Sequence, residues 1–308
     1  MYNIKKELKY RGEKMELIIG KTAGFCFGVK NAVDKTYKQL DEKYSNLYCL
    51  GELVHNEKVV YDLTNKGLII INNINEAPNN STVIIRAHGV NPEVYKLAKD
   101  KLINIIDLTC PKVKNIHELA KNYMNEGYYI MLIAEKSHPE TIGTRGFCGE
   151  NCTIIENLED IKEAVCNFNN STLEKVVIIV QTTFSIANFE NIVGELKNNL
   201  SCDIKIENTI CNATFMRQKE TEEISKQVDV MIVIGGKNSA NTKRLYDIAC
   251  QNCKRAILIQ NKNDNELKMI FEDKFDKIGI TAGASTPQES IIEVVEYIKN
   301  GGKNEHSK

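Results

Sequence analysis

The sequence predicts an α/β protein built from three similar units, each with a mostly parallel sheet. Short β-rich runs alternate with stretches of helical periodicity along the whole chain, which is typical of parallel sheets with helical crossovers. Some runs, such as VVIIV and IVIGG, are apolar without a break. Such runs are typical of strands that are buried on both faces.

A cysteine ends the first strand of each unit. The runs MELIIGKTAGFC, NIIDLTC and DIKIENTIC end at Cys26, Cys110 and Cys211, and a helix is expected after each one. Pro111 suits the first turn of the second of these helices. The apolar stripe after Cys211 is the least regular of the three.

Two further strands in each unit end in polar side chains. The second strands lead to residues that follow their cysteines by 29, 28 and 28 positions, namely His55, His138 and Ser239. The third strands lead to residues that follow by 62, 72 and 74 positions, namely His88, Thr182 and Ser285. Ligands of open parallel sheets bind at the carboxyl edge of the strands, so these side chains are candidate site residues.

The repeat places the three units at 15–98, 99–200 and 201–300. Residues 1–14 form a leader that we expect to be disordered, or to lie upstream of a true start at Met15. Residues 301–308 form a polar tail. Asn91-Pro92 and Thr286-Pro287 are expected to begin helices, each as a cap followed by proline.

Composition narrows the functional classes. The net charge of −1 gives no reason to expect nucleic acid or a membrane surface as a partner, and no apolar run approaches a membrane span. The first residues lack the apolar core of a signal peptide, so a cytoplasmic location is expected. In that reducing compartment the ten cysteines are predicted to be buried thiols, metal ligands or catalytic groups instead of disulfides.

Three thiolates at one site would suit an iron–sulfur cluster better than zinc, and would leave one iron open to substrate. Spacing alone does not establish this, because three separate cysteines in a chain of ten are more often buried structural residues. A zinc site built from Cys148, Cys152, Cys250 and Cys253 is a further alternative.

Nine short motifs in order resemble the IspH/LytB reductase family from Met15 to about residue 300. The motifs are GFCFGV, LVHN, RAHGV, DLTCP, SHPE, QTT, TICNAT, GGKNSAN and TAGAS. The resemblance implies a trefoil of three pseudo-threefold-related α/β units around a central [4Fe–4S] cluster. Its three protein ligands would be Cys26, Cys110 and Cys211, with one iron left open.

The resemblance also implies the reaction. The expected activity is the two-electron reductive dehydroxylation of (E)-4-hydroxy-3-methylbut-2-enyl diphosphate to isopentenyl and dimethylallyl diphosphate, the last step of the non-mevalonate isoprenoid pathway. The expected electron donor is a protein such as ferredoxin or flavodoxin.

The expected catalytic residues are Glu140, Thr182 and His138. We hypothesise that Glu140 delivers a proton, because burial beside an anion raises the pKa of a carboxyl group, and that Thr182 relays it or orients the substrate. The diphosphate is expected to contact mostly neutral donors. These are His55, His88, His138, Thr182, Thr214, Ser239, Asn241 and Ser285.

Ala240 departs from the family pattern, in which a second serine is common, so one diphosphate hydrogen bond is in question. A redox sensor or cluster carrier without catalysis is a competing interpretation, although a carrier needs neither an acid nor a diphosphate pocket. A nucleotide-binding protein is disfavoured, because no G-x-x-x-x-G-K-[ST] or G-x-G-x-x-G motif, the glycine-rich sequences that bind phosphates, follows a predicted strand.

Overall fold

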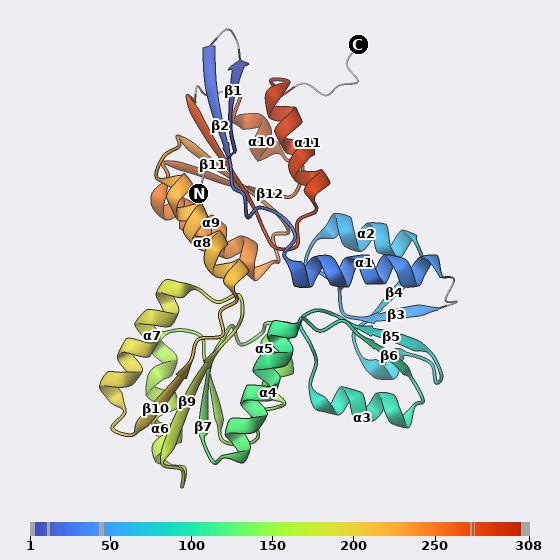
Figure 1. Cartoon of the computed structure of the whole chain (residues 1–308), viewed down its shortest axis with the longest axis vertical. Coiled ribbons are helices and arrows are strands. Elements are labelled where there is room, and N and C mark those ends of the chain that lie inside the picture. The colour runs from blue at the N-terminus through green and yellow to red at the C-terminus, as the bar shows by residue number, and fades with distance from the viewer. Residues whose placement is uncertain (1–3, 11–12, 43–45, 272, 274, 303–308) are drawn as a thin grey trace. The chain divides into compact units, whose positions relative to one another are not determined.

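The computed structural model describes residues 4–10, 13–42, 46–271, 273 and 275–302, and it contains three sheets of five, four and four strands (Figure 1). The described residues form two compact units. Unit 1 lies within 1–29, 54–60 and 212–308, and unit 2 within 30–53 and 61–211. Every described strand pair is parallel except β1 with β2, which confirms three α/β parts with mostly parallel sheets.

The first sheet of unit 2 has the strand order β4-β3-β5-β6. Its strands are β3 (Leu47–Leu50), β4 (Leu68–Ile71), β5 (Thr82–Ile85) and β6 (Asn104–Asp107). The helices along this part of the chain are α1 (Phe27–Asp41), α2 (Glu57–Asn65), η1 (Ile74–Glu76) and α3 (Pro92–Asp100). Ile74 and Ala98 pack with Val83 and Ile85, so η1 and α3 cover one face.

The second sheet of unit 2 has the order β10-β9-β7-β8. Its strands are β7 (Tyr129–Ile133), β8 (Cys152–Ile155), β9 (Lys175–Val180) and β10 (Asp203–Glu207). The helices are α4 (Pro111–Asn125), α5 (Pro139–Arg145), η2 (Leu158–Asp160), α6 (Ile161–Asn169) and α7 (Ile186–Asn199). Helices α6 and α7 pack on one face and α4 on the other, which explains the unbroken apolar run of β9.

Unit 1 contains the five-stranded sheet, in the order β1-β2-β13-β11-β12. Its strands are β1 (Ile4–Tyr10), β2 (Glu13–Ile19), β11 (Val230–Ile234), β12 (Arg255–Ile259) and β13 (Lys277–Ala282). Its helices are α8 (Asn212–Ser225), α9 (Ala240–Asn252), α10 (Asn265–Met269) and α11 (Gln288–Lys299). Figure 1 shows α10 and α11 on one face and α8 and α9 on the other.

The strand that carries each cysteine belongs to a different sheet from the one expected. Strand β2 pairs with β13, β6 pairs with β5, and β10 pairs with β9, all in parallel register. Each of these strands therefore lies next to the last strand of another predicted unit, instead of in the sheet of its own unit. The predicted boundaries 15–98, 99–200 and 201–300 thus each separate one strand from the sheet that it joins, because strand pairing is non-local and the sequence pattern does not reveal it. As domain boundaries they stay a prediction.

The chain ends also differ from expectation. The leader predicted to be disordered over 1–14 forms strand β1 over Ile4–Tyr10, which pairs antiparallel with β2. Disorder therefore does not hold for Ile4–Tyr10, because the antiparallel ladder holds their backbone, and the alternative of a true start at Met15 stays a prediction. The polar tail over 301–308 lies outside the described residues apart from Gly301 and Gly302. Among the helices of the described residues, none is both long enough and apolar enough to cross a membrane.

Candidate active site

The three predicted cluster cysteines occupy equivalent backbone positions. The N–H of Cys26 donates to the carbonyl of Ala284 at 3.2 Å, that of Cys110 to Ala87 at 3.0 Å, and that of Cys211 to Thr182 at 3.1 Å. Each acceptor stands two residues beyond the end of a strand, after β13, β5 and β9 respectively. The backbone thus repeats one arrangement three times, which the spacing in the sequence had indicated.

A helix begins directly after each of these cysteines. Helix α1 starts at Phe27, α4 at Pro111 and α8 at Asn212. The amino end of a helix favours negative charge, and a thiolate is the form of cysteine that binds metals. All three side chains are partly exposed. Cys26 belongs to unit 1, whereas Cys110 and Cys211 belong to unit 2.

The other cysteines that could build a metal site make ordinary structural contacts. The thiol of Cys148 donates to the carbonyl of Thr144 at 3.3 Å, and that of Cys253 to the carbonyl of Val228 at 3.3 Å. Within the part of the chain that the structure describes, no three His, Cys, Asp or Glu residues are gathered as a metal site. The zinc alternative therefore receives no support, and the convergence of the three cluster cysteines stays a prediction.

Glu140 is a buried carboxyl group held by one residue. It stands in the first turn of α5 with 2% of its surface exposed. Thr182 donates to it twice, from its backbone N–H to Oε1 at 2.7 Å and from Oγ1 to Oε2 at 2.6 Å. Burial raises the pKa of Glu140 to about 7, although these two hydrogen bonds lower it. A carboxyl group with this pKa is suited to donate a proton near neutral pH.

His138 contacts the backbone of Glu140, and the ring of His88 packs against that of His138. His138 is the N-cap of α5, and its Nδ1 accepts the backbone N–H of Glu140 at 3.2 Å. In the neutral imidazole this bond places the ring proton on Nε2. The ring centroids of His88 and His138 are 5.4 Å apart in an edge-to-face arrangement. The structure thus brings together His88, His138, Glu140 and Thr182 within unit 2, as expected from the strand ends.

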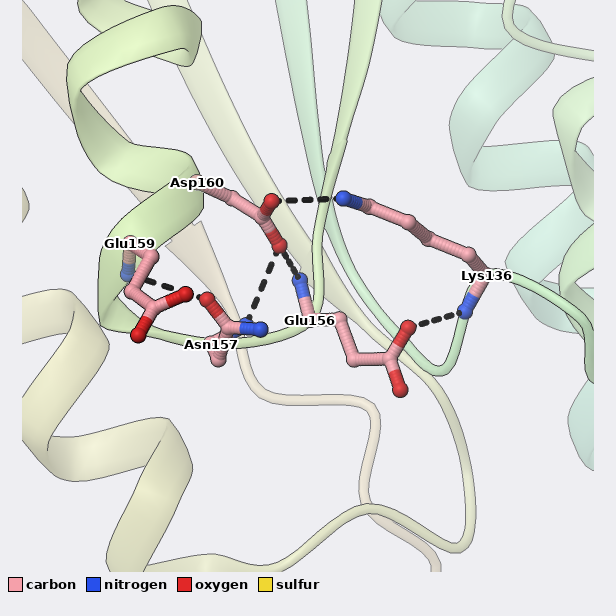
Figure 2. A network of polar contacts seen from close by, with 5 residues as sticks. All are labelled: Lys136, Glu156, Asn157, Glu159 and Asp160. Carbon is pink, nitrogen blue, oxygen red and sulfur yellow. Dashed lines mark hydrogen bonds and ion pairs between the residues drawn. The ribbon is translucent and has the colours of Figure 1, made fainter.

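A polar network anchors the β7–α5 loop that leads to His138. Figure 2 shows the Lys136 ammonium bonded to Asp160, at 2.5 Å, while the N–H of Lys136 donates to Glu156 at 3.0 Å. Asp160 also accepts the N–H groups of Glu156 and Asn157, at 2.8 and 3.2 Å. Burial raises the pKa of Asp160, but the bonds from Lys136, Glu156 and Asn157 outweigh it and leave that pKa low. The loop is therefore tied to the end of β8 and to η2.

Unit 1 gathers the other polar residues at the ends of β11 and β13. Ser239 is the N-cap of α9, and its Oγ accepts the N–H of Thr242 at 3.3 Å. Ser285 donates from Oγ to the carbonyl of His55 at 3.2 Å. A Cβ atom on Gly236 would lie 2.2 Å from the same carbonyl oxygen, so only glycine allows the segment around His55 to pack here. The structure thus brings Ser239, His55 and Ser285 to one edge of the sheet.

Asn241 stands out within this edge. It is 4% exposed, and neither its amide nitrogen nor its amide oxygen has a hydrogen-bond partner among the described residues. An amide buried without partners is costly to the fold, and such groups are often reserved for a ligand. Thr214 is also buried, with 2% of its surface exposed in the first turn of α8.

The predicted helix starts are correct at one position and wrong at the other. Asn91 caps α3 and accepts the N–H of Glu93 at 2.9 Å, with Pro92 in the first turn. Thr286 does not cap α11. Its hydroxyl donates to the carbonyl of Ile234 at 3.0 Å, and Pro287 takes the N-cap position.

Two polar residues of α8, the buried Arg217 and the partly exposed Glu220, were not among the candidates predicted from the sequence. Arg217 is 3% exposed and donates to the carbonyls of Thr22 and Gly24, and Glu220 accepts from Lys21 and Thr22. The irregular apolar stripe of α8 was the only signal, because a helix that buries polar contacts lacks a clean apolar face.

Known proteins are similar to this chain in sequence and in fold. The family model described as LytB protein matches residues 17–299. The chain belongs to the LytB protein family. Its relatives include the 4-hydroxy-3-methylbut-2-enyl diphosphate reductase of Clostridioides difficile, which is 41% identical over 93% of this chain and 100% of the relative. The enzyme of that name from Aquifex aeolicus is 41% identical over 92% of this chain and 96% of the relative.

Two solved structures are also similar to this chain. The E-1-hydroxy-2-methyl-but-2-enyl-4-diphosphate reductase of Plasmodium falciparum matches with a TM-score of 0.83 and 30% identity, over 92% of this chain and 87% of that one. A second structure, described as (E)-4-hydroxy-3-methyl-but-2-enyl diphosphate reductase, the terminal enzyme of the non-mevalonate pathway, matches with a TM-score of 0.67. It is 40% identical over 92% of this chain and 99% of that chain. The family resemblance read from the nine motifs is thereby confirmed.

Proposed function

We propose that this chain is a 4-hydroxy-3-methylbut-2-enyl diphosphate reductase that produces isopentenyl and dimethylallyl diphosphate. Family membership over nearly the whole chain supports this reaction class. The observation that carries the chemistry is the buried Glu140 carboxyl group, with a pKa of about 7 and two bonds from Thr182. A cluster carrier without catalysis would have no use for such an acid.

The proposed cofactor is a [4Fe–4S] cluster held by Cys26, Cys110 and Cys211. The residues fit it, because the three cysteines share one backbone position, precede helix amino ends and are partly exposed. When bound, a cluster with one iron that lacks a protein ligand supplies single electrons and a Lewis-acid position.

The proposed reaction breaks the allylic C–O bond of the substrate. It consumes two electrons and two protons, and it releases the hydroxyl group as water. Glu140 is the proposed source of the proton that the departing oxygen takes up. With a pKa of about 7, a substantial fraction of Glu140 carries its proton at neutral pH. Thr182, bonded to both carboxyl oxygens, fixes the orientation of the acid and can pass its proton onward.

The diphosphate is proposed to bind the polar residues at the strand ends. Ser239, Asn241 and Ser285 lie at the helix-facing edge of the unit 1 sheet, where the amino end of α9 favours an anion. The full proposed set also includes His55, His88, His138, Thr182 and Thr214. A protonated histidine would meet part of the anionic charge. Ala240 supplies no hydroxyl group next to Ser239, so the neighbouring Asn241 amide carries more of the recognition.

The proposed electron donor is a small redox protein such as ferredoxin or flavodoxin, and the proposed location is the cytoplasm. The reducing environment of that compartment is compatible with ten cysteines and an oxygen-sensitive cluster.

Anaerobic reconstitution with iron and sulfide tests the proposal. The purified chain should bind about four iron ions with one iron site distinct by Mössbauer spectroscopy, and should consume the allylic diphosphate with a reduced dye. A chain that binds the cluster but leaves the substrate unchanged would refute the enzyme and leave the carrier.

A further inference from the structure

We propose that Arg217 and Glu220 of helix α8 are positioning residues that hold the loop before Cys26 in the geometry needed for cluster binding. The role of Cys26 as a ligand rests on the proposed function above. The contacts that hold the loop do not depend on the proposed cofactor, because every one of them joins described residues of unit 1.

Glu220 holds the start of the loop. Its Oε1 accepts the N–H of Lys21 at 2.9 Å, and its Oε2 accepts the N–H and the hydroxyl of Thr22 at 2.9 and 2.5 Å. A Cβ atom on Gly20 would lie 2.9 Å from Oε2, so glycine is needed for the carboxylate to come this close. Hydrogen bonds to a charged acceptor are among the stronger ones in proteins.

Arg217 holds the middle of the loop. Its Nε donates to the carbonyl of Thr22 and its Nη2 to the carbonyl of Gly24, both at 2.8 Å. The planar guanidinium group can bridge two acceptors in this way, which the single ammonium of lysine cannot reproduce. Gly24 has a φ of +100°, so the turn that presents its carbonyl also favours glycine.

The loop before Cys26 is the longest of the three cysteine loops. Six residues separate the end of β2 from Cys26, whereas two separate β6 from Cys110 and three separate β10 from Cys211. The shorter loops are held by side chains of the loop itself or of the strand before it. Asp107 accepts the N–H of Thr109 at 2.9 Å, and Thr209 bonds the backbone of Val180. A longer connection has more conformations to restrict, so the side chains of α8 take over that task.

The contacts of Arg217 and Glu220 with residues 21–24, called the clamp below, also connect the segment after Cys211 with the segment before Cys26. Helix α8 begins at the residue after Cys211, and its Arg217 and Glu220 grip the segment that leads to Cys26. A shift of α8 would therefore move the Cys26 loop with it.

Hydrogen exchange and iron content together test the clamp. The variants are Arg217→Met, Arg217→Lys and Glu220→Gln in the full chain, with Lys219→Met and Glu222→Gln as matched exposed controls on the same helix. In the clamp variants, the peptide covering residues 20–26 should exchange at least about tenfold faster, and the reconstituted chain should lose at least half of its iron. Arg217→Lys should be intermediate, and both controls should match the wild type.

Three results would overturn the clamp. These are unchanged exchange of residues 20–26, faster exchange with full iron content and an unaltered electron paramagnetic resonance signal, or equal losses in the controls. If Arg217→Met fails to fold, Arg217→Lys and Glu220→Gln decide the question by the same criteria. A wild-type chain that binds no iron would instead refute the proposed cofactor, whereas a loaded wild type beside equally loaded variants refutes only the clamp.

Discussion

Thr182 donates two separate hydrogen bonds to Glu140, one from the backbone and one from the side chain, to different carboxyl oxygens. Glu140 is a buried residue of the first turn of α5, and His138 accepts its backbone N–H at the same turn. This arrangement fixes the orientation of the acid while its pKa remains near 7.

Replacing Glu140 with Gln should lower turnover by at least about a hundredfold, because the amide keeps the shape but cannot donate a proton as an acid does. Iron content and diphosphate binding should remain as in the wild type. Turnover with reduced dye and iron analysis on the same preparation check this. The matched control is Glu118→Gln, which replaces an exposed carboxylate on α4 and should leave turnover unchanged. A Glu140→Gln variant with normal turnover would remove Glu140 from the mechanism.

Glu140 should also make stability depend on pH. Its pKa in the folded chain, about 7, lies above the ordinary value of 4.5, so its contribution to stability is present below pH 4.5 and is lost as pH rises through 7. Relative to the wild type, Glu140→Gln should therefore gain up to about 3 kcal/mol in the free energy of unfolding between pH 4.5 and pH 8. Urea unfolding at both pH values measures this. A constant difference between the two proteins would contradict a raised pKa.

In the wild type, turnover should fall as pH rises through about 7, because the proton donor is then lost. The pH dependence of the turnover number at saturating substrate tests this. A turnover that stays level up to pH 9 would assign the proton to another group.

Asn241 offers a test that separates binding from folding. Because neither amide atom has a partner among the described residues, Asn241→Leu should leave stability unchanged or raise it. It should weaken the binding of inorganic diphosphate by about tenfold in calorimetry. Asn252→Ala at the other end of α9 removes a hydrogen bond from the amide of Asn252 to the carbonyl of Ile248. It should therefore lower stability and leave the binding of diphosphate unchanged. Loss of stability in Asn241→Leu without loss of binding would make Asn241 structural.

The network in Figure 2 predicts that replacing Asp160 lowers kcat/KM more than replacing Lys136 does. Asp160→Ala should lower turnover over KM by about fivefold, because it releases two backbone N–H groups as well as Lys136. Lys136→Met should change it less than about twofold, since the Lys136 side chain is half exposed and the N–H of Lys136 keeps its bond to Glu156. Equal effects would show that the ion pair itself anchors the loop.

The sequence was sufficient for features that depend on local patterns. Apolar runs located the strands, and the repeated strand–cysteine–helix order placed Cys26, Cys110 and Cys211 at equivalent backbone positions. The pairing of Glu140 with Thr182 was also predicted, because both stand at the carboxyl ends of neighbouring strands, β7 and β9. Such neighbours meet at one edge of a sheet.

Features that depend on distant parts of the chain were missed. Strand β1, with the charged sequence IKKELKY, resembles a polar leader, because lysine-rich strands at the edge of a sheet lack an apolar run. The contacts of Arg217 and Glu220 join residues nearly 200 positions apart, and the hydrophobic periodicity of the sequence does not predict them. Nor does any pattern reveal that β6 pairs with β5 instead of opening the next unit.

Cysteine replacement with iron analysis tests the central claim most directly. Each of the ten cysteines would be replaced singly by serine, and the anaerobically reconstituted chains compared for iron content and for the visible absorption of the cluster. We expect Cys26→Ser, Cys110→Ser and Cys211→Ser to lose the cluster while the other seven variants retain it. Full retention in any of those three variants, or a requirement for Cys148, Cys152, Cys250 or Cys253, would contradict the proposed cluster site.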